Sequence, residues 1–498
     1  MSLFIRRLIH LRPVRLAAGI PLVLLASYLI GQWSLDGAKL RILIFVALQL
    51  GIVAVSLRRP RLAMLGLLVY LPLMGIFRRW LIPYAGWSAI DPLILLAPMT
   101  VLLLGSYWAY RTYIQRQPIM NDTRLFRIVR WLLLIELLQV LNPLQGGLMS
   151  GLGGVIFYTV PLMWLLLTRI YADERWMRIV TALVLAVGAL GALYGFKQMH
   201  LGFFDFELRW VYTAGYAALM IGPGIVRPFS IFTSAAEYTQ YLLIATIIAW
   251  CWLLRGRPLQ RAIGLLTLPL TAYMLFMGAS RTPVVLGLMA LAALTVAHAR
   301  SARARAALAI AMLAACLLAF RLITSIDVGD NSFAARQVNG LSNPFDAEHS
   351  TLGLHWHYFV DGIASGLRNP LGYGLGATTL AGDKFGGSSM NSEVDFSNML
   401  VSTGLFGGVL YVWLILRTLR LAFACCREGV TQLTVLGILL GTLGSWSIGG
   451  NYSTVVIIWL CIGYLDAYTG RLSAPESATR QLERRKQTHA DVRYHPDV

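Results

Sequence analysis

The stretch MRIVTALVLAVGALGALYG, residues 177–195, decides the fold class of this chain. It carries one charged residue, Arg178, and it is close to the ~20 apolar residues that an α-helix needs to cross a bilayer. Similar runs recur along the chain, in which 57% of the residues are hydrophobic and only 13% are charged. This composition lies outside the range of soluble globular domains. The sequence therefore predicts an all-α polytopic membrane protein.

The apolar runs predict about fourteen membrane-spanning helices. With a cytoplasmic N-terminus, the connections richest in arginine fall on the cytoplasmic side, as the positive-inside rule requires. Both termini are then expected in the cytoplasm, and the first span, which no convincing cleavage site follows, is expected to act as a signal anchor. The expected spans are 16–33, 40–57, 61–77, 90–110, 125–141, 153–170, 177–195, 235–254, 261–278, 283–299, 306–324, 398–417, 430–447 and 452–469.

The net charge of +19 follows mostly from this topology. Because the basic residues gather in the cytoplasmic connections and in the tail 471–498, they do not indicate a nucleic-acid partner. The tail is either a solvated basic end or a contact with anionic lipids. The five cysteines lie in expected spans or at their cytoplasmic ends, so no outer disulfide, metal site or other cofactor is expected.

A long polar segment, residues 321–397, interrupts the apolar runs and is expected to lie outside the membrane. Long loops of compact proteins often carry function. Within it, Asn369-Pro-Leu-Gly-Tyr-Gly-Leu-Gly376 places three glycines at alternating positions behind a proline. Since proline disfavours helix at the preceding residue and glycine permits close backbone approach, this stretch predicts a sharp turn that returns the loop to the helix bundle.

The same segment holds candidate proton-transfer groups. His355 and His357 would point to different sides of a helix, so they are not expected to chelate one metal together. Each makes ordinary interfacial hydrogen bonds, or one of them binds substrate or moves a proton. Glu393 and Asp395 either accept a proton from a substrate hydroxyl or pair with outer arginines. The residues leave these alternatives open.

Several basic residues fall on the outer side, against the positive-inside rule: Lys197, Arg209, Arg227, Arg281 and Arg368. Arg227 just precedes a span, and Arg281 ends the tight turn Gly278-Ala-Ser-Arg. Such cations snorkel, pair with carboxylates or hold a ligand. The planar guanidinium binds phosphate oxygens bidentately, and a lipid-linked pyrophosphate presents its phosphates at this depth. We therefore expect these residues to bind substrate.

Four short motifs occur in an order that carries a family resemblance. Arg227-Pro-Phe-Ser-Ile-Phe-Thr233 fits an Arg-x-x-Gly/Ser-x-Phe turn, and Gly278-Ala-Ser-Arg281 fits a Gly-Ser-Arg turn. Asn369–Gly376 fits a Pro-Leu-x-Gly-x-Gly signature, and Gly404-Leu-Phe-Gly407 fits Gly-Leu-x-Gly. Together, over about residues 220–420, they resemble the O-antigen ligase and Wzy-type polysaccharide polymerase superfamily of membrane glycosyltransferases.

The resemblance implies a GT-C-like, metal-independent and inverting glycosyl transfer outside the cytoplasmic (inner) membrane of a bacterium. The donor would be a glycan on undecaprenyl pyrophosphate, and the acceptor another lipid-linked repeat unit. Arg227 and Arg281 would hold the pyrophosphate, and Glu393, Asp395 or His355 would activate the acceptor hydroxyl. The implied partners are the undecaprenyl-pyrophosphate-linked oligosaccharide, the lipid bilayer and a chain-length regulator.

Two rival functions remain open. Ligases of this family, which transfer the glycan to lipid A core, carry a His-Asn pair where this chain has Glu393-Val394, and this difference favours a polymerase. A non-enzymatic polysaccharide flippase or transporter would place its charges near the midplane, whereas the candidates here gather at the outer mouth. The expected regions are an N-terminal bundle (1–220), central spans with both arginine turns (221–320), the periplasmic loop (321–397), C-terminal spans (398–470) and a basic cytoplasmic tail (471–498).

Overall fold

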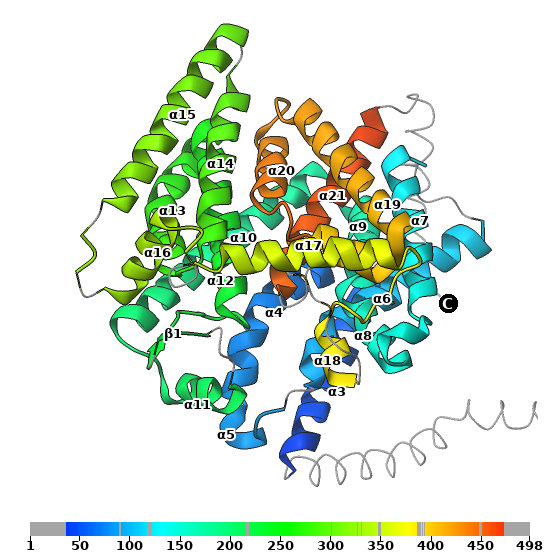
Figure 1. Ribbon diagram of the computed structural model, residues 1–498. Coiled ribbons are helices and arrows are strands. Elements are labelled where there is room, and N and C mark those ends of the chain that lie inside the picture. Colours follow the sequence, from blue (N-terminus) through cyan, green and yellow to red (C-terminus); the bar gives the residue numbers. More distant parts are fainter. Residues whose placement is uncertain are drawn as a thin grey trace, which may run out of the picture.

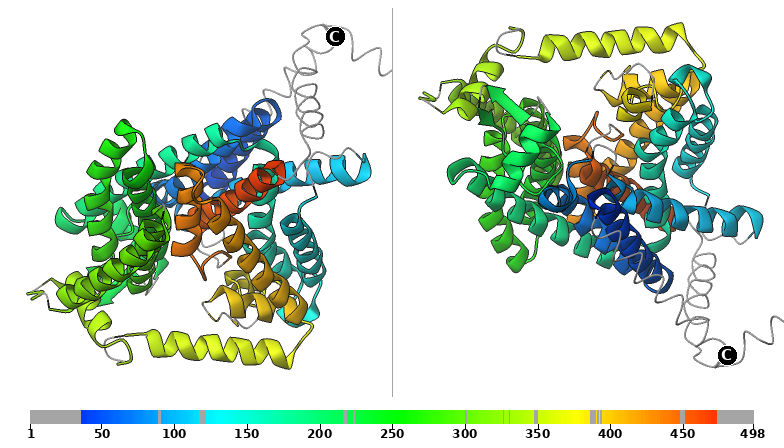
Figure 2. Two further views of the ribbon diagram at one scale, coloured as in Figure 1. Left: turned by 90° about the horizontal axis from the view of Figure 1, so that it is seen from above. Right: turned by 90° about the horizontal axis from the view of Figure 1, so that it is seen from below.

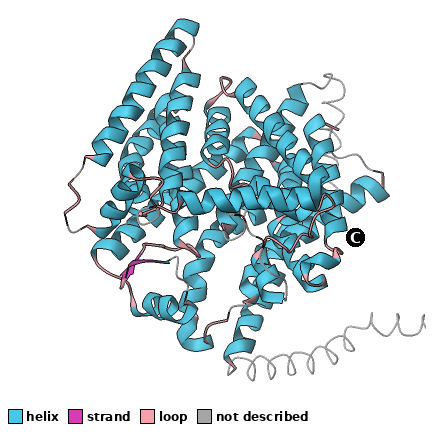
Figure 3. Ribbon diagram, in the orientation of Figure 1, coloured by secondary structure: helices cyan, strands magenta, loops and turns pink. Residues whose placement is uncertain are grey.

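Helices make up most of the described part of the protein, as Figure 3 shows. Within the described residues, the one sheet is a hairpin of β1 (Met220–Gly222) and β2 (Ile225–Val226). The computed structural model describes residues 36–88, 91–116, 122–215, 219–222, 224–299, 301–325, 327–329, 331–346, 350–385, 390, 392, 394–447 and 451–472.

Eleven helices of the described chain are long and apolar enough to cross a membrane, so this is a multi-pass membrane protein. Two of them are composite. One joins η1 (Pro92–Leu95), α6 (Leu96–Ala109) and η2 (Tyr110–Ile114), and the other joins α8 (Leu148–Phe157) and α9 (Thr159–Tyr171). The others are α3 (Gly37–Arg58), α4 (Pro60–Trp80), α10 (Glu174–His200), α12 (Ala235–Arg255), α13 (Pro258–Met277), α14 (Arg281–His298), α15 (Ala302–Thr324), α19 (Asp395–Cys425) and α21 (Tyr452–Leu472).

These eleven helices coincide with eleven of the expected spans. The expected span 16–33 lies outside the described residues. The expected spans 125–141 and 430–447 form shorter helices, α7 (Arg124–Gln139) with 16 residues and α20 (Val430–Gly441) with 12. The remaining short helices are α5 (Ile82–Ala85), η3 (Pro143–Gln145), α11 (Asp205–Ala214), α16 (Ser332–Ser342), α17 (Leu352–Arg368) and α18 (Leu380–Phe385).

Helices α12 and α21 form the centre of the bundle, since 83% of the apolar window of each is buried, whereas none of the α15 window is buried. Small residues let the central helices approach closely. A Cβ on Gly188 would lie 2.5 Å from Ala245 Cβ, and a Cβ on Gly437 would lie 2.6 Å from Ile247 Cγ2. Close backbone packing of this kind drives helix association in lipid, where burial of apolar surface contributes little.

The polar segment 321–397 is not a single irregular loop, because it contains α16, α17 and α18. Helix α17 runs across the long helices in Figure 1, and Figure 2 shows it along one side of the molecule, between α16 and α19. It packs on α19 through Gly362 and Gly366. A Cβ on Gly362 would lie 2.9 Å from Ser397 Cβ, and one on Gly366 would lie 2.5 Å from Leu400 Cγ. The small-x-x-x-small spacing permits this contact.

Helix α19 is broken at Gly404, whose φ of 72° and ψ of −174° are not helical. The turn after α17 binds the backbone groups on both sides of the break. Leu405 N donates to Pro370 O at 2.8 Å, and Tyr373 N donates to Val401 O at 2.8 Å. A membrane helix tolerates such a break only where protein groups satisfy its backbone. The expected return of the Gly-rich turn to the bundle is therefore confirmed. The turn packs against the Gly404-Leu-Phe-Gly407 motif of α19.

The other side of the Gly-rich turn lies against the segment after α7. Asn142 Nδ2 donates to Gly372 O at 3.0 Å, and Gly376 N donates to Gln145 Oε1 at 2.9 Å. A Cβ on Gly376 would lie 2.3 Å from Ser150 Oγ, so no larger residue fits there without movement. The turn is thus held between the α7–α8 region and α19.

Candidate functional site

The structure brings the two predicted arginine turns together. Arg227 donates from Nε and Nη2 to Gly278 O, at 3.2 and 2.8 Å, and from Nη2 to Ser280 Oγ. Ser280 precedes Arg281, the first residue of α14. The Arg227 side chain is therefore bound to the turn that carries Arg281. Both acceptors are uncharged oxygens.

Each of the two turns contains a non-glycine residue in the left-handed region. Ser230 follows Arg227 by three residues, and both Ser230 and Ala279 have φ of 52°. Such a conformation costs about 1–2 kcal/mol for a residue with a Cβ. It persists only where the surroundings hold it, and strained residues cluster at functional sites.

Helix α16 of the long polar segment covers the Gly278–Arg281 turn. Gln337, which is fully buried, donates from Nε2 to Ser280 O at 3.2 Å. Gly340 lies directly against the arginine, since a Cβ there would be 2.1 Å from Arg281 Nη1. Arg336, exposed on the same helix, acts electrostatically on Arg281. The long segment therefore folds back over the arginines.

We call Arg227, Arg281, Arg336 and the N-terminus of α14 the arginine site. A helix N-terminus presents unpaired backbone N–H groups and a partial positive charge. Three guanidinium groups beside it make a region of concentrated positive potential. Such an arrangement suits a phosphate or pyrophosphate, whose oxygens accept hydrogen bonds from both kinds of donor.

Arg79 supports the Arg227 turn and was not singled out from the sequence. It is only 1% exposed, donates to Phe232 O and Ser230 O at 2.6 Å each, and lies 4.6 Å from the ring centroid of Phe229. Gln198 Oε1 accepts from Ser230 N at 2.7 Å on the other side. The signal available in the sequence was an arginine at the outer end of an expected span, against the positive-inside rule.

Asp395, a predicted catalytic acid, is the first residue of α19 and is 1% exposed. Its Oδ2 accepts from Tyr411 OH and Ser447 N, each at 3.0 Å, and from Trp446 N. These bonds tie α19 to the segment between α20 and α21. The placement favours a positioning role over proton transfer. Glu393, the other predicted acid, lies outside the described residues.

His355, His357 and Arg368 all lie on α17 and are exposed. His355 precedes Gly362 by seven residues, or about two turns, so it shares the face that packs on α19. His357 lies on a different face, as expected. Thr351 Oγ1 lies 3.1 Å from His355 Nε2, and the N-terminal end of α17 follows α16 along the chain.

Lys197 and Arg209 lie near α11 and not on the arginine site. Lys197 Nζ is 3.2 Å from the ring centroid of Phe204, and Arg209 is exposed. Trp210, the next residue, is buried and packs edge-on against Phe229 with 4.9 Å between the ring centroids. Helix α11, which carries Arg209, is therefore a neighbour of the Arg227 turn.

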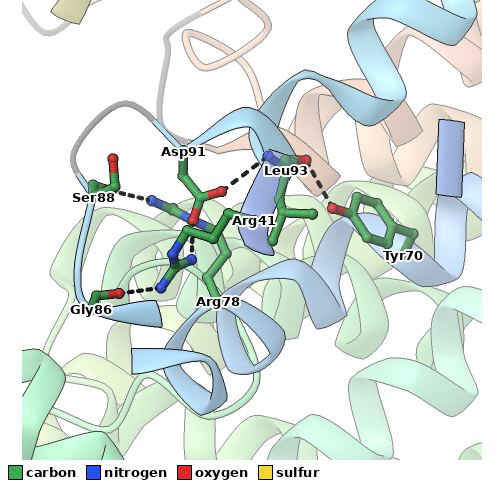
Figure 4. A network of polar contacts seen from close by, with 7 residues as sticks. All are labelled: Arg41, Tyr70, Arg78, Gly86, Ser88, Asp91 and Leu93. Atoms are coloured by element: carbon green, nitrogen blue, oxygen red, sulfur yellow. Dashed lines mark hydrogen bonds and ion pairs between the residues drawn. The ribbon is translucent and has the colours of Figure 1, made fainter. Parts of the chain in front are cut away.

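A second buried basic cluster lies at the ends of α3 and α4. Figure 4 shows Arg41 and Arg78 reaching the same carboxylate of Asp91, at 2.5 and 3.0 Å. Two cations share one anion, so the network carries excess positive charge. Burial, and to a smaller extent the charge of Arg78, lowers the pKa of Lys384 on α18. Helix α18 and this network are thus electrostatic neighbours.

Comparisons with known proteins supply no relative: no protein-family model, no curated protein and no solved structure matches the chain. In the described residues, no group of three or more His, Cys, Asp or Glu side chains is placed to hold a metal ion.

Proposed function

We propose that this protein is a membrane glycosyltransferase that elongates polysaccharide, transferring a glycan from undecaprenyl pyrophosphate to another lipid-linked repeat unit. The observation that carries the proposal is the arginine site, where Arg227 is bound to the turn that carries Arg281 beneath α16. The four motifs that resemble the polymerase and ligase superfamily include both of these turns. The GT-C-like classification and the exact number of spans belong to the same proposal.

In this mechanism, the arginine site binds the pyrophosphate oxygens of the donor. The acceptor hydroxyl attacks the anomeric carbon from the face opposite the pyrophosphate, so the configuration inverts. The anomeric C–O bond breaks, and the leaving pyrophosphate takes the electron pair. Its negative charge grows during this step, and fixed cationic donors stabilise that charge more in the transition state than in the ground state.

The acceptor hydroxyl must lose a proton to a base. His355 fits this role better than Asp395, because it is exposed and shares the bundle-facing side of α17, whereas Asp395 is enclosed by donors. Imidazole accepts a proton at neutral pH. Glu393 remains the second candidate from the sequence. The arginine site would face the periplasm, with both termini in the cytoplasm.

The test is transfer by purified protein in proteoliposomes supplied with undecaprenyl-pyrophosphate oligosaccharide, with products resolved by length. Each of Arg227→Ala and Arg281→Ala should slow transfer about 100-fold, which is typical of losing one donor to a developing oxyanion. Arg321→Ala is the control, since Arg321 is an exposed cation at the end of α15 and outside the site. Full activity of both site variants would contradict the proposal.

The acceptor is tested in the same preparation. A polymerase should produce a ladder of lengths on the carrier lipid, whereas a ligase should move the glycan only when lipid A core is added. The Glu393-Val394 departure from the ligase pattern favours the ladder.

A further inference from the structure

A groove opens between the end of α4 and the start of α11, with a volume of about 440 Å³. This size is in the range of ~300–1,000 Å³ that small-molecule sites occupy. Both α5 and α11 lie at the bottom of Figure 1. One wall is formed by Trp80, Pro83 and Tyr84, and the other by Phe204, Asp205, Phe206 and Arg209.

Aromatic rings on both walls are open to the groove side. Trp80 is 55% exposed, Tyr84 67% and Phe204 48%. The Trp80 and Tyr84 rings lie edge to face with 6.0 Å between centroids, and the Phe204 and Phe206 rings stack at 5.9 Å. Two walls therefore present flat apolar surfaces to whatever occupies the space between them.

Charged groups stand beside these rings. Asp205 and Arg209 are exposed and lie one helical turn apart on α11, so both reach the same side of the groove. Lys197 lies over the Phe204 ring. The groove thus combines flat rings with a carboxylate that accepts hydrogen bonds and cations that donate them.

This combination matches a saccharide. A pyranose ring has apolar C–H faces, which stack on aromatic rings, and a rim of hydroxyls, which exchange hydrogen bonds with carboxylate and guanidinium groups. The lining contains no Leu, Ile or Val side chain, and its charged groups suit hydroxyls better than an acyl chain.

Three buried side chains pack between the groove and the arginine site. Trp210 follows Arg209, and it packs on Phe229 of the Arg227 turn. Arg79 precedes Trp80 and lies 5.0 Å from the Trp210 ring centroid while binding the carbonyls of the same turn. The groove walls and the arginine site therefore share their supporting backbone.

We propose that this groove is a saccharide-binding subsite, which holds the sugar chain of the substrate while the arginine site holds its pyrophosphate. The assignment of a saccharide as the ligand rests on the proposed function, but a saccharide can bind in the groove without being transferred. Trp80, Tyr84 and Phe204 supply the stacking surfaces, and Asp205 and Arg209 the hydrogen bonds.

The experiment measures binding of lipid-free oligosaccharides to the full-length protein in nanodiscs, by saturation-transfer NMR and calorimetry. The probes are oligosaccharides released by mild acid from the surface polysaccharide of the native host. Tyr84→Ala, Phe204→Ala and Arg209→Gln should each weaken binding about tenfold, equivalent to ~1.4 kcal/mol. Tyr212→Ala is the matched control, because Tyr212 is 70% exposed on α11 but does not line the groove.

Arg281→Ala separates this proposal from the proposed function. It should slow transfer about 100-fold and leave lipid-free oligosaccharide binding unchanged. If oligosaccharides bind and the groove variants bind as tightly as wild type, the subsite is wrong, and the rings instead contact lipid headgroups. Absence of any oligosaccharide binding would overturn it as well. If binding follows the groove residues but no transfer is observed, the subsite stands and the glycosyltransferase proposal fails.

Discussion

The contact between the Gly-rich turn and the break in α19 allows a quantitative test. A Cβ on Gly404 would lie 2.3 Å from Pro370 O, a distance that Cβ atoms essentially never adopt. The backbone at Gly404 has φ of 72° and ψ of −174°, a region that residues with a Cβ rarely adopt and that costs about 1–3 kcal/mol. Forcing a methyl group into a packed contact adds about 1–3 kcal/mol. Gly404→Ala should therefore destabilise the protein by about 2–6 kcal/mol.

Gly224→Ala isolates the backbone contribution. Gly224 has φ of +75°, close to that of Gly404, and a Cβ there would meet nothing within 4 Å. This variant should lose only the conformational part, about 1–2 kcal/mol. The difference between the two variants then measures the contact itself.

The assay follows thermal unfolding in detergent with a thiol-reactive fluorophore. Cys251, Cys425, Cys426 and Cys461 are buried and unpaired, so they become reactive when the protein opens. Unfolding of such proteins is commonly irreversible, so apparent midpoints at one scan rate are compared. Equal midpoints for Gly404→Ala and Gly224→Ala would refute the docking of the turn on α19.

Three further predictions concern the site. Asp395→Ala should lower the unfolding midpoint strongly, because it leaves buried donors unpaired at a cost of about 1–3 kcal/mol each. Asp395→Asn should keep most of the transfer activity. An Asn variant that is stable but inactive would instead identify Asp395 as the catalytic base. Gly340→Ala should displace the flexible Arg281 side chain. It should raise KM for the lipid-linked donor with little change in the unfolding midpoint. An unchanged KM would show that α16 does not pack against Arg281. Arg79→Lys should reduce transfer at least as much as Arg227→Lys. The reason is that an ammonium group cannot bind both carbonyls and stack on the rings as the guanidinium of Arg79 does. Wild-type turnover of Arg79→Lys would show that Arg79 does not support the Arg227 turn.

The sequence predicted the bundle because hydropathy is a local property. Runs of apolar residues identified the eleven spanning helices. The predicted ends of the helices were less accurate. Helix α19 begins at Asp395, three residues before the expected span, and α20 ends at Gly441, six residues before the expected span ends. Polar first turns and backbone breaks are set by distant partners, and hydropathy does not report them.

Long-range partners also explain which site residues were missed. Arg79 binds carbonyls that lie 151 and 153 residues away, and Arg41 reaches Asp91 over 50 residues. No spacing rule connects such positions. The Arg227 and Arg281 turns were found because each places an arginine at the outer end of a span, a pattern that the positive-inside rule makes visible.

The arrangement also indicates which parts of the site are fixed. Arg79, Gln198 and the hydrogen bonds of Arg227 hold the cationic turns on transmembrane helices, and all of these contacts are independent of the long polar segment. Helix α16 adds to them the Gln337 hydrogen bond and the close contact between Gly340 and Arg281. A cationic site held on transmembrane helices and covered by a separate segment suits a reaction in which a large lipid-linked sugar must enter and leave. Perturbing α16 should therefore change turnover before it changes stability, whereas perturbing Arg79 should change both.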